Sequence, residues 1–162
     1  MPISPVLGRL VFVPTLLIVH HTPSPSMQVM FEAVVAGAGD PELAGVTVIR
    51  RAALSATAAD VLGADGIVLG TPANIGYMSG ALKHFFDTVY YPCLDATAAL
   101  PFGYYVHGNQ GTEGAVRAVE SITGAMRWRR VAAAVVVQGE PVKKEIESCR
   151  ELGATVAAVA LG

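Results

Sequence analysis

The chain has 162 residues, of which 52% are hydrophobic and 15% are charged, and its formal net charge is -2. A chain of this length forms one ordinary domain, and this composition predicts an extensive core. The small net charge offers no basic surface for nucleic acid and no strongly charged face for a membrane, so we expect neither partner. Cys93 and Cys149 lack metal-ligand spacing and are interpreted as free thiols in a reducing cytoplasm.

The apolar stretch Leu10–Val19 follows Arg9 and could be mistaken for a targeting segment. It is too short to cross a bilayer and contains Pro14, so we predict a buried strand and no membrane insertion. Residues 1–13 are expected to be an N-terminal extension without regular structure, which folding does not require. The domain itself is expected to comprise residues 14–162.

Short apolar runs alternate with longer helical patterns along this domain. The predicted strands span residues 16–21, 46–50, 66–71, 102–107 and 131–137. The predicted helices begin near Ser26, Ser55, Met78, Thr112 and Pro141, with Ser26 as an N-cap and Pro141 in a first turn. The run Arg127–Arg130 is interpreted as the C-terminus of a helix, where cations suit the helix dipole.

Five apolar strands separated by helices predict an α/β fold with three layers, in which a five-stranded parallel sheet carries helices on both faces. Right-handed crossovers leave few strand orders, and we expect the common order 2-1-3-4-5. Ligands bind such sheets beyond the carboxyl ends of the strands. The loops after the first, third and fourth strands are therefore the candidate site.

The first loop carries three hydroxyl groups and two prolines just before a helix. A helix N-terminus offers free N–H groups and a positive dipole end, which suit a phosphate, although Pro23 and Pro25 have no N–H to donate. A capped loop without a ligand is the alternative. The candidate residues here are His21, Thr22, Ser24, Ser26, Met27 and Gln28.

The two adjacent histidines, His20 and His21, lie on a predicted strand and must point to opposite faces of the sheet. They cannot chelate one metal ion in that geometry, and we predict no metal site. His21 is interpreted either as a residue that reaches the ligand or as a structural histidine.

The second loop carries the most specific pattern in the chain. Gly70-Thr71-Pro72, then Gly76, then Ser79-Gly80-Ala81-Leu82-Lys83 and Asp87 resemble the second flavin loop and following helix of the NAD(P)H-dependent FMN reductase and quinone reductase branch of the flavodoxin superfamily. The resemblance implies a flavodoxin-like fold that holds FMN. It places six residues around the flavin ring: Pro72, Ala73, Asn74, Ile75, Gly76 and Tyr77. Gly76 would allow the backbone to approach the ring closely.

The third loop is rich in glycine and amides. In the resembling family a similar loop covers the pyrimidine end of the flavin, which implies that Asn109 or Gln110 hydrogen-bonds the ring carbonyls. As a pattern by itself it is common. Its candidate residues are His107, Gly108, Asn109, Gln110, Gly111 and Thr112.

The resemblance implies an FMN-dependent oxidoreductase that uses NADH or NADPH to reduce a quinone or flavin acceptor. Because the cofactor carries the chemistry, no catalytic side chain is predicted. A flavodoxin-type electron carrier is one alternative. A flavodoxin-like binding module that has lost flavin is another, since Pro23 and Pro25 remove donors from the phosphate loop. We expect a cytoplasmic homodimer or homotetramer.

Overall fold

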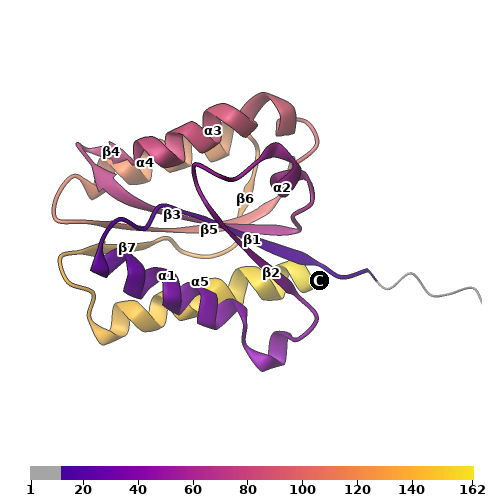
Figure 1. Cartoon of the computed structure of the whole chain (residues 1–162), viewed down its shortest axis with the longest axis horizontal. Helices are drawn as coiled ribbons and strands as arrows, with labels where there is room; N and C mark the ends of the chain where they lie inside the picture. The colour runs from indigo at the N-terminus through magenta and orange to yellow at the C-terminus, as the bar shows by residue number, and fades with distance from the viewer. Residues whose placement is uncertain (1–11) are drawn as a thin grey trace, which may run out of the picture.

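The computed structural model describes residues 12–162 and forms a three-layer α/β sandwich (Figure 1). The central strands are parallel and follow the order β2-β1-β3-β5, with β6 and β7 beyond β5. Their bounds are β1 Thr15–His20, β2 Thr47–Ala52, β3 Gly66–Asn74 and β5 Pro101–Gly108. The predicted flavodoxin-like order 2-1-3-4-5 is therefore confirmed.

Helices cover both faces of the sheet, which explains why its strands read as continuous apolar runs. One layer contains α2 (Ala58–Leu62), α3 (Gly80–Cys93) and α4 (Thr112–Ala125), and the other contains α1 (Pro25–Ala38) and α5 (Lys143–Leu161) (Figure 1). A short 3-10 helix, η1 (Pro41–Leu43), leads from α1 toward β2. Within residues 12–162, no helix combines the length and the apolar character needed to cross a bilayer.

The fifth strand position is divided between two short strands, so the single predicted strand over 131–137 is wrong. β6 (Arg129–Arg130) pairs with the start of β5, and β7 (Val135–Gln138) pairs with its end. An edge strand pairs with a neighbour on one side only, so the chain can leave the sheet after β6 and rejoin it at β7. The run Arg127–Arg130 also follows α4 rather than ending it, because Trp128 is buried and donates from Nε1 to Thr97 Oγ1 at 2.9 Å.

Two predicted helix starts are corrected by the observed capping contacts. Ser24, not Ser26, caps α1, since its Oγ accepts a hydrogen bond from the N–H of Met27 at 3.2 Å. The last helix begins at Lys143, and Pro141 lies before its cap residue Val142. Both errors are small because a proline or hydroxyl residue fits more than one position near a helix start.

The first residues of the domain join the sheet. The carbonyl oxygen of Pro14 accepts from the N–H of Thr47 at 2.9 Å, whereas Phe12 and Val13 are exposed. The predicted N-terminal extension otherwise lies outside the described residues.

A row of three residues runs across the sheet on the face that α1 and α5 cover. His20, Gly70 and Tyr105 are register partners on neighbouring strands, so they share one face. The fully buried ring of Tyr105 lies over Gly70, where a β-carbon would be 2.1 Å from Tyr105 Cζ. The Tyr105 hydroxyl has no hydrogen-bond partner among the described residues, and burial raises the pKa of Tyr105.

Candidate functional site

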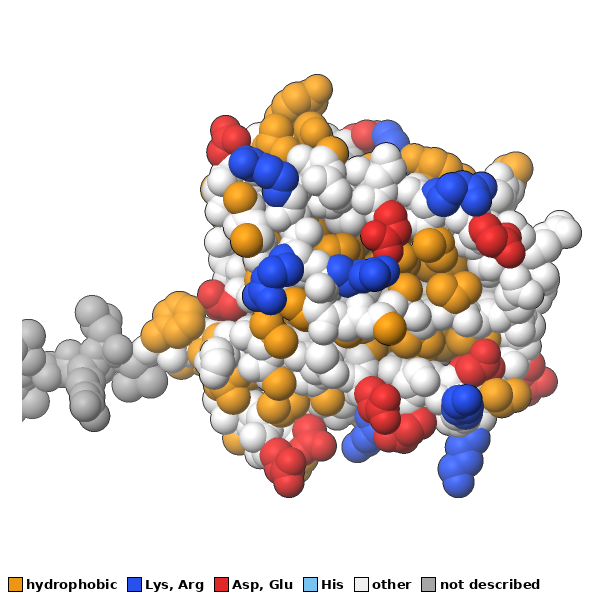
Figure 2. All heavy atoms as spheres, turned by 180° about the vertical axis from the view of Figure 1, so that it is seen from behind, with side chains coloured by type: hydrophobic (Ala, Val, Ile, Leu, Met, Phe, Trp, Pro, Cys, Tyr) orange, Lys and Arg blue, Asp and Glu red, His pale blue; other side chains and the backbone are white. Residues whose placement is uncertain are grey.

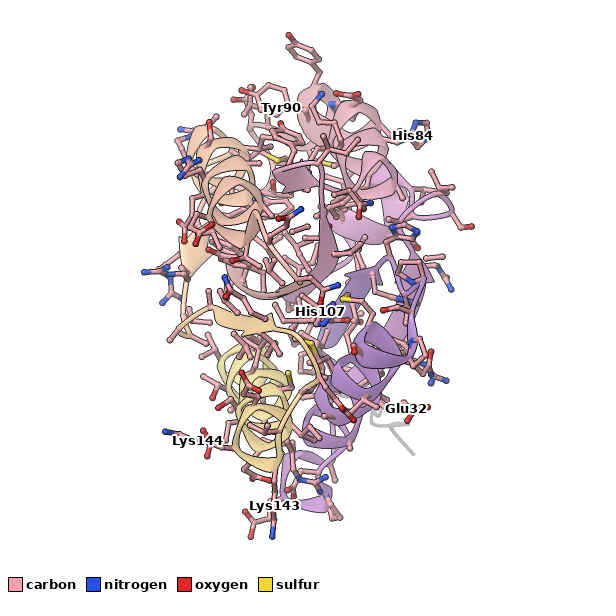
Figure 3. All side chains as sticks on the ribbon, turned by 90° about the vertical axis from the view of Figure 1, so that its left-hand side faces the viewer. Glu32, His84, Tyr90, His107, Lys143 and Lys144 are labelled. Carbon is pink, nitrogen blue, oxygen red and sulfur yellow. The ribbon has the colours of Figure 1, made fainter. Side chains whose placement is uncertain are left out.

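The carboxyl ends of β1, β3, β5 and β7 meet at one edge of the sheet, and all three predicted loops begin there. Figure 3 faces this edge and shows His107 near its middle, with Lys143 and Lys144 at the start of α5 below it. The structure thus brings together three loops that are tens of residues apart in the sequence, as parallel crossovers require.

The first loop presents hydroxyl and N–H groups at the start of α1. The first N–H groups of a helix have no partner within it. Here the N–H of Met27 bonds to Ser24 Oγ and that of Gln28 to the Ser24 carbonyl, which leaves the N–H of Ser26 free within the described structure. Thr22 is held by His20, whose Nδ1 lies 2.7 Å from Thr22 Oγ1. The loop therefore keeps anion-binding donors despite its two prolines.

Two predicted residues of this loop point elsewhere. Met27 is fully buried in the core between α1 and the sheet. The Gln28 side chain donates from Nε2 to Glu32 Oε1 at 2.8 Å on the exposed side of α1. Their side chains thus have partners away from the ligand edge.

His21 contains a buried polar atom without a partner. Its N–H bonds to the carbonyl oxygen of Gly70 at 3.0 Å, but its Nδ1 is buried and forms no hydrogen bond within the described residues. Leaving such an atom unpaired costs roughly 1–3 kcal/mol. The unpaired atom lies close to the first loop in the chain, because His21 directly follows the last residue of β1.

The second loop is a β-hairpin that the sequence did not predict. β3 continues to Asn74, turns at Ile75 and Gly76, and returns as β4 (Tyr77–Met78). Thr71 fixes its base, since Thr71 Oγ1 accepts from the N–H of Ser79 at 3.0 Å. The hairpin replaces the predicted start of α3 at Met78; a glycine between two β-prone residues was the available signal.

Ile75 at the tip of this hairpin is strained and exposed. The φ angle of Ile75 is 51° and that of Gly76 is 69°, and Ile75 is fully exposed. A β-branched residue is rare in the left-handed region, where a two-residue hairpin turn favours Asn, Asp or Gly. A strained residue that also exposes a large apolar side chain is typical of a ligand contact.

The second and third loops pack backbone to backbone. A β-carbon on Gly114 would lie 1.8 Å from the Gly76 carbonyl oxygen, and one on Gly111 would lie 3.0 Å from Gly76 Cα. A β-carbon on Gly76 itself would meet nothing within 4 Å. Gly76 therefore approaches the backbone of α4 closely, and Gly114, which is not among the predicted site residues, permits this contact. The regular spacing of glycines at 108, 111 and 114 was its only signal.

Two predicted residues of the third loop anchor it to the end of β7. His107 Nε2 donates to the Gly139 carbonyl oxygen at 2.7 Å, since a carbonyl can only accept. Gln138 Nε2 donates to Thr112 Oγ1, which is buried, at 3.0 Å. Gln138 and Gly139 lie at the end of β7, outside the three loops predicted to form the site, and no motif in the sequence marks them.

The remaining residues of this loop are positioned differently. Asn109 and Gln110 are exposed at its tip, and their side-chain amides form no hydrogen bond within the described residues. Gly108 is buried, and a β-carbon there would lie 2.9 Å from Ala73 Cβ of the second loop. The tip is therefore free to contact a ligand while its base is rigidly packed.

A hollow of about 620 Å³ adjoins the third loop on the side of β7. Both charge signs and two valines line it, so it can accept a mixed polar and apolar molecule beside the loop edge. Its lining residues are Thr112, Glu113, Val116, Arg117, Val136, Gln138 and Glu145.

The ionisable groups at this edge are few. Burial, followed by the charges of Arg50 and His21, lowers the pKa of His20. Among residues 12–162 no group of three His, Cys, Asp or Glu side chains is placed to hold a metal ion. The free donors of the first loop, the apolar hairpin tip and the exposed amides of the third loop together fit a planar ligand that bears a phosphate.

Comparisons with known proteins agree with this geometry. The family model described as NADPH-dependent FMN reductase matches residues 46–141. A flavodoxin from Aquifex aeolicus (strain VF5) is 31% identical over an alignment 159 positions long, and the match covers 87% of this chain and 84% of that protein.

Solved structures show the same fold. The flavodoxin, WrbA-like protein from Agrobacterium tumefaciens has a TM-score of 0.73 at 23% identity and covers 91% of this chain and 97% of its own. A flavodoxin from the domain Archaea has a TM-score of 0.74 at 17% identity, covering 90% and 98%. An oxidoreductase from Corynebacterium diphtheriae has a TM-score of 0.68 at 18% identity, covering 91% and 96%.

Proposed function

Because this chain belongs to the NADPH-dependent FMN reductase family, we propose that it is an FMN-dependent oxidoreductase that reduces a quinone or flavin acceptor with NADH or NADPH. The observation that carries the proposal is the convergence of three loops at one edge, with a strained apolar hairpin between a phosphate-type helix start and an amide-rich loop. Bound FMN supplies the redox chemistry, and the protein binds and orients it.

Each loop has a distinct role in this proposal. Thr22, Ser24 and Ser26 bind the phosphate with hydroxyl and N–H donors. Ile75 covers one face of the ring and excludes water there, while Asn109 or Gln110 donates hydrogen bonds to the ring carbonyls. The hollow beside β7 leaves room for the nicotinamide nucleotide or the acceptor next to the ring.

An electron carrier is the second candidate, favoured by the 31% identical relative named flavodoxin. Carriers meet their protein partners through complementary charge. The net charge here is only -2, and the face in Figure 2 mixes Lys and Arg with Asp and Glu around hydrophobic patches. These charges support the reductase over the carrier.

The proposal is tested by flavin titration followed by turnover. FMN should bind about 100-fold more tightly than riboflavin, since charge-assisted hydrogen bonds to a phosphate contribute about 2.7 kcal/mol in total. The FMN-loaded protein should then oxidise NADH or NADPH steadily when a quinone is present. Equal affinity for the two flavins would contradict the phosphate site, and FMN binding without oxidation of either nucleotide would favour the carrier.

A variant at the hairpin tip separates strain from ligand contact. Ile75→Asn should raise the free energy of unfolding without flavin by about 1 kcal/mol, because Asn adopts the left-handed conformation more easily. It should also weaken binding of both FMN and riboflavin about tenfold, because a ring contact is lost. Denaturant unfolding and flavin titration check the two effects, and Ile75→Val is the control that keeps the strain and most of the apolar surface. Unchanged flavin affinity in Ile75→Asn would place the ring elsewhere.

The assembly, location and N-terminal extension are further proposals. The outer edge of β7 is unpaired within the described residues and exposes 40% of Val136, so a second subunit of a homodimer or homotetramer could pair with this apolar strand edge.

Cys93 and Cys149 are buried free thiols, which supports a cytoplasmic location. We expect a chain that begins at Pro14 to fold and bind FMN as the full chain does.

A further inference from the structure

The first loop has few backbone N–H donors, because Pro23 and Pro25 have none. The side chain that adjoins it is His20, the last residue of β1, whose Nδ1 lies 2.7 Å from Thr22 Oγ1. The imidazole ring is held by stacking on Phe31 of α1, with ring centroids 3.9 Å apart and an angle of 23° between the planes. His20 is thus fixed against the first hydroxyl of the phosphate loop.

The contact between His20 and Thr22 allows two arrangements of the shared proton. When Nδ1 is unprotonated it accepts the Thr22 hydroxyl hydrogen, and that hydroxyl has nothing left to donate. When Nδ1 carries a proton it donates to Thr22 Oγ1, and the Thr22 O–H can then point to an anion in the loop. A doubly protonated ring enforces the second arrangement and adds a positive charge.

The neighbours of His20 favour the neutral form of the ring. Burial, then Arg50 on β2, then His21 on β1, lowers the pKa of His20. Its row partners on β3 and β5 are Gly70 and the unionised Tyr105. On α1, Glu32 is exposed and accepts from Gln28, and no carboxylate bonds to His20 within the described residues.

We propose that His20 takes up a proton from solvent when the phosphate of FMN binds, and that it thereby positions the Thr22 hydroxyl toward this phosphate. The inference rests on the proposed FMN site. The only covalent change is a new N–H bond on the His20 ring, formed with a proton from solvent. The positive charge of this proton balances part of the negative charge of the phosphate. His20 would therefore be a positioning residue that selects phosphorylated flavin.

The sign of the pH dependence follows from this uptake. The pKa of His20 is higher with phosphate bound than without it, so FMN affinity is greatest at low pH and falls as pH rises through the bound-state pKa. The second ionisation of a phosphate monoester, near about pH 6, acts in the opposite direction. Measurements between about pH 6.5 and about pH 8.5 isolate the histidine, because the phosphate is then mostly a dianion.

The test is calorimetric titration of the full chain with FMN and with riboflavin. At about pH 7, in two buffers of different ionisation enthalpy, FMN binding should take up a fraction of a proton and riboflavin binding none. FMN affinity should fall about tenfold between about pH 6.5 and about pH 8.5, and riboflavin affinity should stay constant. His20→Asn keeps a donor near the Nδ1 position without a charge, so it should abolish both the uptake and the pH slope. His84→Asn, on the exposed face of α3, is the matched control and should behave as the parent does.

A pair of Thr22 variants tests the hydroxyl. Thr22→Val should remove the proton uptake, and Thr22→Ser should restore it. FMN binding without uptake or pH slope in the parent overturns the inference and leaves the proposed function standing, and so does uptake that persists in His20→Asn. If FMN and riboflavin bind equally at every pH, the proposed phosphate site itself fails. The parent titrations and the Thr22 pair decide the question even if His20→Asn does not fold.

Discussion

Gly114→Ala should lower the free energy of unfolding by about 2–3 kcal/mol and weaken FMN binding at least about tenfold. The new β-carbon would lie 1.8 Å from the Gly76 carbonyl oxygen, and backbone cannot move aside as the end of a flexible side chain can. The hairpin must therefore shift away from α4, which would disturb the proposed contact between Ile75 and the flavin ring. Chemical denaturation and flavin titration measure the two effects.

The same helix provides a matched control. Gly124 also lies in α4, and a β-carbon there would meet nothing within 4 Å. Gly124→Ala should therefore raise stability by about 0.5–1 kcal/mol, the usual gain in helix propensity, and leave FMN affinity unchanged. Equal stability changes in the two variants would show that the hairpin does not pack on α4 as described.

Gly70→Ala is expected to destabilise the fold by about 3 kcal/mol. Its β-carbon would lie 2.1 Å from Cζ of Tyr105, whose ring is fully buried between the sheet and the helices α1 and α5. Gly70 lies beside His20 in the central strand, and its carbonyl oxygen accepts from the N–H of His21, so the shift should also reach the first loop and weaken FMN binding. Thermal and denaturant unfolding provide the measurement.

A double-mutant cycle assigns this cost to Tyr105. Tyr105→Leu alone should cost about 2 kcal/mol through the cavity it leaves. In that background the Gly70→Ala methyl has space, and its additional cost should fall below about 1 kcal/mol. Additive effects of the two substitutions would mean that the methyl clashes with a group other than the tyrosine ring.

The charged face of α3 is an example of a feature that the local sequence is sufficient to predict. Lys83 and Asp87 pair four residues apart at 2.6 Å on an exposed side of the helix, which any helix with this spacing would allow. By contrast, the wrong cap at Ser26 arose because three hydroxyl residues compete for one position, and only the path of the chain after β1 selects Ser24. Local sequence therefore indicates the element and leaves its boundary to the packing.

The sequence by itself determined the parallel sheet and its strand order, because apolar runs of strand length separated by helices permit few other arrangements. The tertiary structure alone decided the hairpin of β3 and β4, the division of the fifth strand into β6 and β7, and the contact between Gly114 and Gly76. It also decided that Gln138 holds Thr112. These features depend on which backbone surfaces meet across tens of residues, and steric fit between distant segments leaves no periodic signal in the chain.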